Sequence, residues 1–315
     1  MTDPKKRRHS TTFRILFCDD IVPRCVPLTY RLYLLAVKWG RSLGKRLPGK
    51  KSKIVAENRE GIFTSEACFG STRSPVINKT FMEREDDLAE PRTHALVVAL
   101  EGLRAKLQES GLKNTSAAGS FKAKDFLPEK ERNKLWENTW LLTHAMPKPS
   151  DIVLDLGGAS TLFSFYVASL GCPTHVLDYD WGQHGLIYNA RYVARCMGWN
   201  MRLYNRDLSR LLPFQDGSFD KIYCVCVLEH LPSDVRRKTM SEIKRVLKPG
   251  GLAAMTFDYD TARNDPWFDK GLRYGLKDQL FRDILEPAGM KIVGNQIFVD
   301  NCPSSFFLGS LFLKK

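Results

Sequence analysis

Short apolar runs alternate with longer, mixed stretches through the second half of the chain. The runs are the length of buried strands and several are rich in Val, Ile and Leu, which is typical of parallel strands. They cover residues 152–156, 175–178, 201–204, 222–227 and 252–257. The stretches 160–170 and 234–247 have the spacing of helices. Strands that alternate with helices predict an α/β fold with a parallel sheet.

A glycine turn ends the first of these strands and points to a ligand. Asp155 closes the strand, and Gly157 and Gly158 follow. A backbone that turns sharply after a parallel strand can bring its amides close to a bound molecule. Asp178 ends the second strand, 23 residues after Asp155. A ribose-binding carboxylate is expected about 20 residues after the glycine turn. The pattern predicts a cofactor that contains a nucleoside.

The residues of the turn favour S-adenosylmethionine as that cofactor. A dinucleotide site requires Gly-x-Gly-x-x-Gly, and the sequence from Gly157 to Leu162 meets only the first glycine position. Asp155 at the strand end suits an ammonium group, which S-adenosylmethionine carries together with a ribose and an adenine but no phosphate. Asp207 and Leu208 follow the third strand, where a carboxylate can accept from the adenine amine.

Four motifs in order resemble those of class I S-adenosylmethionine-dependent methyltransferases, of the ubiquinone/menaquinone-biosynthesis type. They are Val153-Leu154-Asp155-Leu156-Gly157-Gly158, Leu212-Pro213-Phe214 with Ser218-Phe219-Asp220, Leu228-Glu229-His230-Leu231, and Arg245-Val246-Leu247-Lys248-Pro249-Gly250-Gly251. The resemblance covers residues 126–315. It implies a Rossmann-like, seven-stranded mixed sheet with helices on both faces and an antiparallel last strand, here residues 306–315. A helix at 277–288 and a strand at 291–298 precede it.

The resemblance also assigns residues to the cofactor. Ala159 and Thr161 stand where later glycines of the family's turn often lie, and Ala159 is small enough to keep the turn. The residues expected to contact S-adenosylmethionine are Asp155, Gly157, Gly158, Ala159, Asp178, Tyr179, Asp207, Leu208, Cys224 and Val225.

Glu229 and His230 are the candidate catalytic residues. They follow the fourth strand, and ligands of open α/β sheets sit beyond the carboxyl ends of the strands. A histidine suits the removal of a proton from a hydroxyl acceptor; alternatively, His230 braces its loop through the backbone. Cys226 stands where relatives with a divalent metal carry the first acid of Glu-x-x-Glu-His, so no metal is expected.

Two tryptophans are expected on the substrate side of the site. Trp136 and Trp140 lie four residues apart in a helix expected over 128–145, so they share one face. That face either covers the cofactor cleft or packs on the sheet, and Trp140 is the candidate substrate wall. Trp267 lies in a polar loop after the fifth strand, where insertions of this fold shape the acceptor pocket.

Positive charge is concentrated at the amino-terminal end. Residues 1–60 hold 15 Lys and Arg against 5 Asp and Glu, and the whole chain has a net charge of +13. A basic stretch with aromatic residues, 28–47, suits an amphipathic helix on an anionic membrane, RNA phosphates, or packing on the catalytic domain. Three parts are therefore expected: a basic arm (1–60), a partly helical extension (61–125) and a methyltransferase domain (126–315).

The cysteine spacing and the hydropathy of the chain indicate the cellular compartment in which the protein is expected. The eight cysteines form no Cys-x-x-Cys pair, and no apolar run is long enough to cross a bilayer. A cytoplasmic protein is expected, with a possible peripheral membrane contact through the arm. The expected activity is methyl transfer to a hydroxyl or amine of a small molecule, lipid or glycan. A nucleic-acid methyltransferase and a non-catalytic cofactor-binding scaffold remain as alternatives.

Overall fold

The computed structural model describes eight parts of the chain, all within the compact unit Ile62–Lys315. The described parts are residues 76–80, 86–112, 114–116, 120–124, 132–180, 185–259, 280–299 and 307–315. The predicted basic arm and the loop that contains Trp267 lie outside the described residues.

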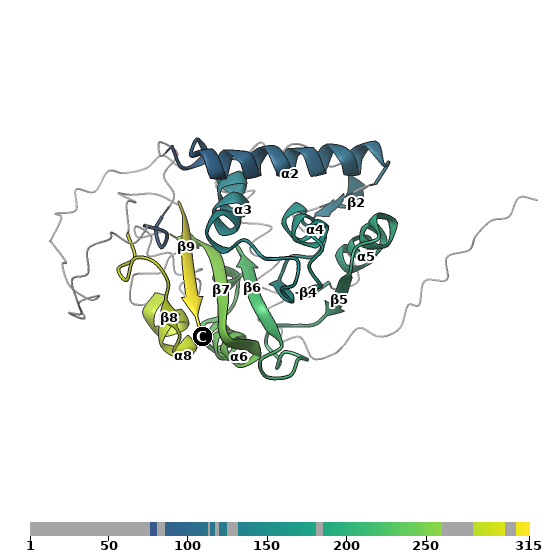
Figure 1. Cartoon of the computed structure of the whole chain (residues 1–315). Coiled ribbons are helices and arrows are strands. Elements are labelled where there is room, and N and C mark those ends of the chain that lie inside the picture. The colour runs from purple at the N-terminus through teal and green to yellow at the C-terminus, as the bar shows by residue number, and fades with distance from the viewer. Residues whose placement is uncertain are drawn as a thin grey trace, which may run out of the picture. The chain divides into compact units, whose positions relative to one another are not determined.

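A seven-stranded mixed sheet forms the centre of the fold, which confirms the predicted fold class (Figure 1). Its strand order is β5-β4-β3-β6-β7-β9-β8. The first five strands in this order run parallel, and β9 is antiparallel to both of its neighbours. The strands are β3 (Val153–Leu156), β4 (Thr174–Asp178), β5 (Met201–Asn205), β6 (Phe219–Val225), β7 (Leu247–Tyr259), β8 (Lys291–Ile292) and β9 (Phe307–Lys314).

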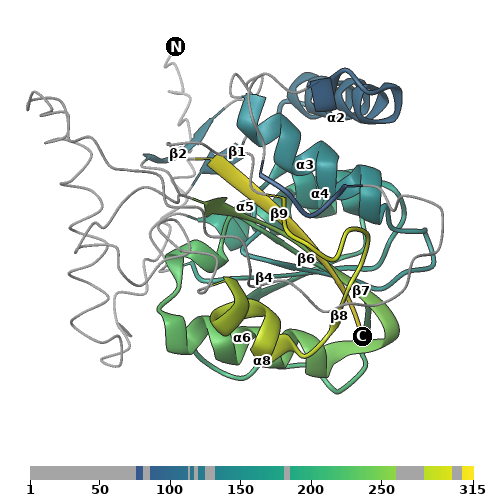
Figure 2. The ribbon, with the colours of Figure 1, turned by 90° about the vertical axis from the view of Figure 1, so that its left-hand side faces the viewer.

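Helices cover both faces of this sheet (Figure 2). One face carries α2 (Pro91–Glu109), α3 (Arg132–Ala145), α4 (Leu162–Ser169) and α5 (Leu186–Met197). The other carries α6 (Ser233–Val246), the π-helical turn η4 (Phe281–Leu285) and α8 (Glu286–Ala288). A hairpin of β1 (Asn114–Ser116) and β2 (Ser120–Lys124) follows α2, and two 3₁₀ turns, η1 (Asp86–Leu88) and η2 (Leu228–His230), complete the described elements.

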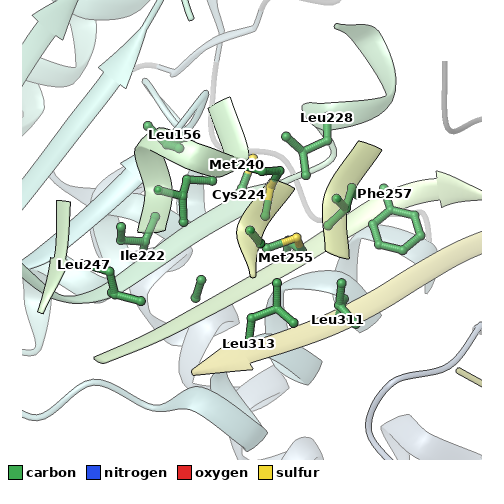
Figure 3. Close-up of a cluster of buried hydrophobic side chains, with 14 of the residues drawn as sticks. Leu156, Ile222, Cys224, Leu228, Met240, Leu247, Met255, Phe257, Leu311 and Leu313 are labelled. Atoms are coloured by element: carbon green, nitrogen blue, oxygen red, sulfur yellow. The ribbon is translucent and has the colours of Figure 1, made fainter. Parts of the chain in front are cut away.

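The strand pleat divides the apolar core between the two faces. Leu154, Ile222 and Met255 pack with Met240 and Ile243 of α6, as Figure 3 shows for several members of this cluster. The alternate positions Val153, Tyr223 and Ala254 pack with the tryptophans of α3. Successive strand side chains point to opposite faces, so strands buried on both faces require near-continuous apolar runs. This is why the sequence pattern located the sheet.

Two predicted strands have different extents in the structure. β7 begins at Leu247, directly after the last residue of α6, so residues 248–251, which lie between the expected helix and the expected strand, are part of the strand, with Gly250 at φ +78°. Its partner explains this, because Gly250 N donates to Lys315 O (2.9 Å) and Lys315 N donates to Gly251 O (3.1 Å). The strand expected over 291–298 is limited to Lys291–Ile292.

An early segment of the chain holds the region after β8. Asn78 is buried, and its Nδ2 donates to Val293 O (2.7 Å) and Asn295 O (2.8 Å). Its Oδ1 accepts from Phe312 N of β9 (2.8 Å). The carbonyl groups of Val293 and Asn295 therefore bond to a side chain rather than to another strand. The domain boundary at 126 stays a prediction, although residues 76–80 make these contacts with the sheet.

Among the described residues, no helix is both long enough and apolar enough to cross a membrane.

Candidate functional site

The glycine turn after β3 approaches the loop that follows β6. Gly157 has φ of +80°, and a Cβ there would lie 2.4 Å from Cγ2 of Val227. Its amide donates to Leu177 O of the neighbouring strand β4 (2.7 Å). Both the backbone conformation and the available space therefore require glycine.

Gly158 and Asp155 are in close contact at the same turn. A Cβ at Gly158 would lie 2.0 Å from Asp155 Oδ2, and the hydroxyl of Ser164 on α4 donates to that oxygen. Asp155 is 1% exposed, and its Oδ1 has no hydrogen-bond partner among the described residues. Burial raises the pKa of Asp155 to about 7. A buried carboxylate with an unpaired oxygen is suited to a cationic group of a ligand.

Asp178 at the end of β4 connects the turn to its own strand. Its Oδ2 accepts from Ala159 N (3.0 Å), and its Oδ1 accepts from Tyr179 N (2.7 Å). Burial raises the pKa of Asp178 to about 6, against the opposing effect of these two amides. Each carboxylate oxygen has more than one lone pair, so these bonds leave capacity for a ligand hydroxyl.

The predicted adenine residues lie at the end of the neighbouring strand β5. Asp207 Oδ1 accepts from Ser209 N (2.8 Å), and Leu208 is buried. Arg206 N donates to Asp178 O (2.9 Å), so this segment lies beside the predicted ribose carboxylate. The structure therefore brings together the carboxyl ends of β3, β4 and β5, the three strands that carry the predicted cofactor acids.

Cys224 and Val225 of β6 have different surroundings. The side chain of Cys224 packs in the cluster against α6, beside Met240 (Figure 3). Val225 is half-buried and packs on the α3 side. A cofactor contact at Cys224 would therefore involve its backbone, and both residues remain predictions.

A second group of polar side chains lies at the carboxyl ends of β6 and β7. Cys226, Glu229 and Asp258 place one sulfur or oxygen atom each within 4.8 Å of one another. The Cys226 thiol donates to Glu137 Oε1 of α3, and its sulfur lies 3.7 Å from Asp258 Oδ1. Thr256 Oγ1 and Lys134 Nζ also donate to Glu137, at 3.0 and 2.7 Å.

Glu229 and His230 differ sharply in exposure. The Glu229 side chain is fully buried, whereas the imidazole of His230 is 55% exposed and its Nε2 lies 3.9 Å from Glu229 Oε1. Glu229 Oε1 accepts from Asp258 N (3.2 Å), and Oε2 has no hydrogen-bond partner among the described residues. Burial raises the pKa of Glu229 to about 7. His230 N donates to Val227 O (3.0 Å), so the backbone of η2 is also bonded to its own loop.

The two tryptophans of α3 share one face and stack with ring centroids 5.5 Å apart. Both are buried: Trp136 Nε1 donates to Asp87 Oδ2 (2.9 Å), and Trp140 Nε1 donates to Ile77 O (3.1 Å). Their polar atoms thus bond to the early segments of the chain. The assignment of Trp140 to a substrate wall remains a prediction, and Trp267 lies outside the described residues.

The sequence pattern missed four polar residues of this region. Ser164 and Asn189 bond to the turn, the latter through Ser160 Oγ (2.7 Å), while Glu137 and Asp258 both contact the sulfur of Cys226. Glu137 gives a usable signal, because it is a carboxylate between two tryptophans of one helix. A buried acid is almost always paired, so its position between the tryptophans predicts polar partners inside the fold.

The domain recognised by comparison covers the central part of the sheet. A family model described as "Methyltransferase domain" matches residues 154–255. A curated relative, the sterol 24-C-methyltransferase of Pneumocystis carinii (strain B80), is 32% identical over 148 residues. That alignment covers 44% of this chain and 36% of the relative, so this chain matches little more than a third of the relative's length.

Solved structures with a similar chain path include two bacterial or archaeal proteins. A SAM-dependent methyltransferase from Aquifex aeolicus has 15% identity and a TM-score of 0.41, covering 56% of this chain and 88% of that one. A SAM-dependent methyltransferase from Methanosarcina mazei has 20% identity and a TM-score of 0.42, covering 55% of this chain and 96% of that one.

Proposed function

We propose that this chain, through its domain at residues 154–255, is a class I S-adenosylmethionine-dependent methyltransferase that transfers a methyl group to a small molecule, lipid or glycan. The observation that carries the proposal is the buried Asp155 beside the glycine turn. One of its oxygens has no partner among the described residues, and it suits the ammonium group of S-adenosylmethionine.

The other cofactor contacts are assigned to the carboxyl ends of the neighbouring strands β4 and β5. Asp178 would accept from the ribose hydroxyls, and Asp207 would accept from the adenine amine while Leu208 contacts the ring. Tyr179 and the backbone of 157–159 would lie around the same ligand. When bound, S-adenosylmethionine supplies a methyl group activated by its sulfonium. The chain then has to position an acceptor in line with that group and exclude competing water.

The acceptor is proposed to be a hydroxyl or an amine. His230 lies beyond β6, next to Glu229, and its exposed imidazole would take the acceptor's proton while the methyl group is transferred. The name of the curated relative supports a small-molecule or lipid acceptor, since that enzyme is described as acting on a sterol. Trp140 and Trp267 are proposed as walls of the acceptor pocket.

A methyl-transfer screen tests this proposal directly. The purified chain is incubated with tritiated-methyl S-adenosylmethionine and with separate lipid, glycan, small-molecule and nucleic-acid fractions of a cell extract. We expect label in one of the first three fractions, at least about tenfold above an Asp178→Ala control. Label confined to nucleic acid would transfer the assignment to that substrate class. Cofactor binding without label in any fraction would support a scaffold.

The net charge of residues 1–60 motivates a second, separable proposal, namely a peripheral contact with an anionic surface. Deleting these residues should leave cofactor affinity unchanged and should reduce sedimentation with anionic vesicles, most visibly at low salt. Loss of RNA binding without any vesicle binding would favour a nucleic-acid partner instead.

A further inference from the structure

The polar group beyond β6 and β7 joins three elements that are distant in the sequence. Cys226 directly follows β6, Glu229 lies in η2, and Asp258 comes from β7. They offer one sulfur and two carboxylate oxygens, with all three donor atoms within 4.8 Å of one another. Asp258 is the ligand candidate that no local motif reveals, because it enters the group from a neighbouring strand.

The spacing of the donors is compatible with a small ion. In a tetrahedral zinc site, metal–sulfur and metal–oxygen bonds of about 2.3 and 2.1 Å place sulfur and oxygen about 3.6 Å apart. Cys226 Sγ and Asp258 Oδ1 are 3.7 Å apart. The outer limit of the group is 4.8 Å, so its most distant donors would have to approach each other by up to about 1.2 Å about an ion.

Glu229 provides an independent indication of a ligand. The whole residue is only 2% exposed, yet Oε2 has no hydrogen-bond partner among the described residues. Buried carboxylate oxygens are costly to leave unbonded, by about 1–3 kcal/mol or more. Its other oxygen already accepts from Asp258 N, which fixes the carboxylate beside the second acid of the group.

Against the expectation from the sequence that Cys226 excludes a metal, we propose that Cys226, Glu229 and Asp258 bind one divalent transition-metal ion, with Zn²⁺ as the best match. A thiolate is a soft ligand that selects Zn²⁺ over Mg²⁺ or Ca²⁺, and three protein ligands leave a position for water or an acceptor oxygen. On binding, the thiol proton of Cys226 is released to solvent and a metal–sulfur bond replaces the S–H bond. Glu137 keeps Thr256 Oγ1 and Lys134 Nζ as donors, and the ammonium of Lys134 offsets the added negative charge.

The ion would be held at the carboxyl ends of β6 and β7, where the proposed acceptor enters. The metal site does not depend on the proposed methyl transfer. Metal binding is measurable without cofactor or acceptor. A failure of the metal proposal and a failure of the proposed function are therefore distinguishable.

Cobalt substitution is the sharpest test, because a Co²⁺–thiolate bond absorbs in the near ultraviolet. The full, untagged chain is titrated with Co²⁺ and, by competition, with Zn²⁺ and Mg²⁺. We expect one equivalent to give a charge-transfer band, and Zn²⁺ but not millimolar Mg²⁺ to displace the Co²⁺. Cys226→Ser should remove the band, and Asp258→Asn should weaken Zn²⁺ binding by at least about tenfold.

Cys196→Ser is the matched control, since this cysteine is exposed on α5 and outside the group. It should keep the band and the Zn²⁺ affinity. The affinity for S-adenosylhomocysteine is measured on every variant and reports whether the domain remains folded. If Cys226→Ser does not fold, Asp258→Asn alone is compared with Cys196→Ser. The proposal is overturned if the wild-type chain shows no charge-transfer band, or if Cys226→Ser and Asp258→Asn bind Zn²⁺ as tightly as Cys196→Ser.

Discussion

Replacing Asp178 with alanine should weaken S-adenosylmethionine binding more than any other single change at the end of β4. Its carboxylate accepts from Ala159 N (3.0 Å) and Tyr179 N (2.7 Å), and in the proposed complex it also accepts from the ribose. The substitution thus removes a ligand contact and a connection between the glycine turn and β4. Loss of the ribose contact and loss of the bonds that hold the turn should both weaken the complex with the cofactor.

The magnitude follows from the kind of bond that is lost. A hydrogen bond to a charged group contributes about 1.5–3 kcal/mol, which corresponds to a loss of affinity of about 10- to 150-fold. Asp178→Asn retains one amide oxygen and the volume of the side chain but removes the charge. Its affinity should therefore lie between those of the wild type and Asp178→Ala.

Calorimetry at pH 7.5 and at pH 5.5 tests both the contact and the charge. Asp178 has a pKa raised to about 6, so its carboxylate is ionised above that pH and protonated below it. Wild-type affinity should fall as the pH decreases through 6, because the protonated group loses an acceptor site. Asp155, with a pKa of about 7, contributes in the same direction, so Asp178→Asn should keep only part of this dependence.

Asp234→Ala, an exposed substitution on α6, is the control and should bind as the wild type does. Unchanged affinity in Asp178→Ala would refute the ribose assignment. The next candidate would be Asp180, although its Oδ2 already accepts from Ile187 N at the start of α5 (3.2 Å).

Three further substitutions test other parts of the site and fold. Gly158→Ala places a Cβ 2.0 Å from Asp155 Oδ2, so we expect about 1–3 kcal/mol of destabilisation and loss of cofactor binding, by urea unfolding and calorimetry. Asn78→Ala leaves buried carbonyl and amide groups of the last strands without partners and should cost about 2–4 kcal/mol in urea unfolding, with exposed Gln296→Ala nearly neutral. His230→Ala should lower kcat by about 10²–10⁴ if the acceptor is a hydroxyl, and a large fall in Tm would instead mean that the residue braces the fold.

The fold was predictable because its strands are buried on both faces. Continuous apolar runs such as 222–225 of β6 have no competing surface position, so the pattern located each central strand. The edge was harder to predict. The residues after Ile292 retain an apolar character, but their carbonyl groups bond to Asn78, more than 200 positions away in sequence, and no local pattern carries that information.

The same distinction applies to the site. Asp155 and Gly157 lie at the end of β3, and Asp178 ends its parallel neighbour β4. Their proximity therefore follows from the parallel topology alone. Glu137 and Asp258 lie 121 positions apart, and both reach the sulfur of Cys226 because α3 packs on β7. Burial also separates residues that the sequence treats as a pair, since Glu229 is inside the fold and His230 is largely outside it.

Two buried carboxylates, those of Asp155 and Glu229, lie in the two parts of the proposed site. Asp155 ends β3 and Glu229 follows β6, and these two strands are direct neighbours in the sheet. Each acid has one oxygen without a hydrogen-bond partner among the described residues, whereas the carboxylate of Glu137, equally buried, is bonded at both oxygens. An acid with a purely structural role is expected to be satisfied by its own chain, as Glu137 is. The unsatisfied oxygens therefore support the two proposed positions for positively charged ligands, one at the cofactor turn and one at the end of β6.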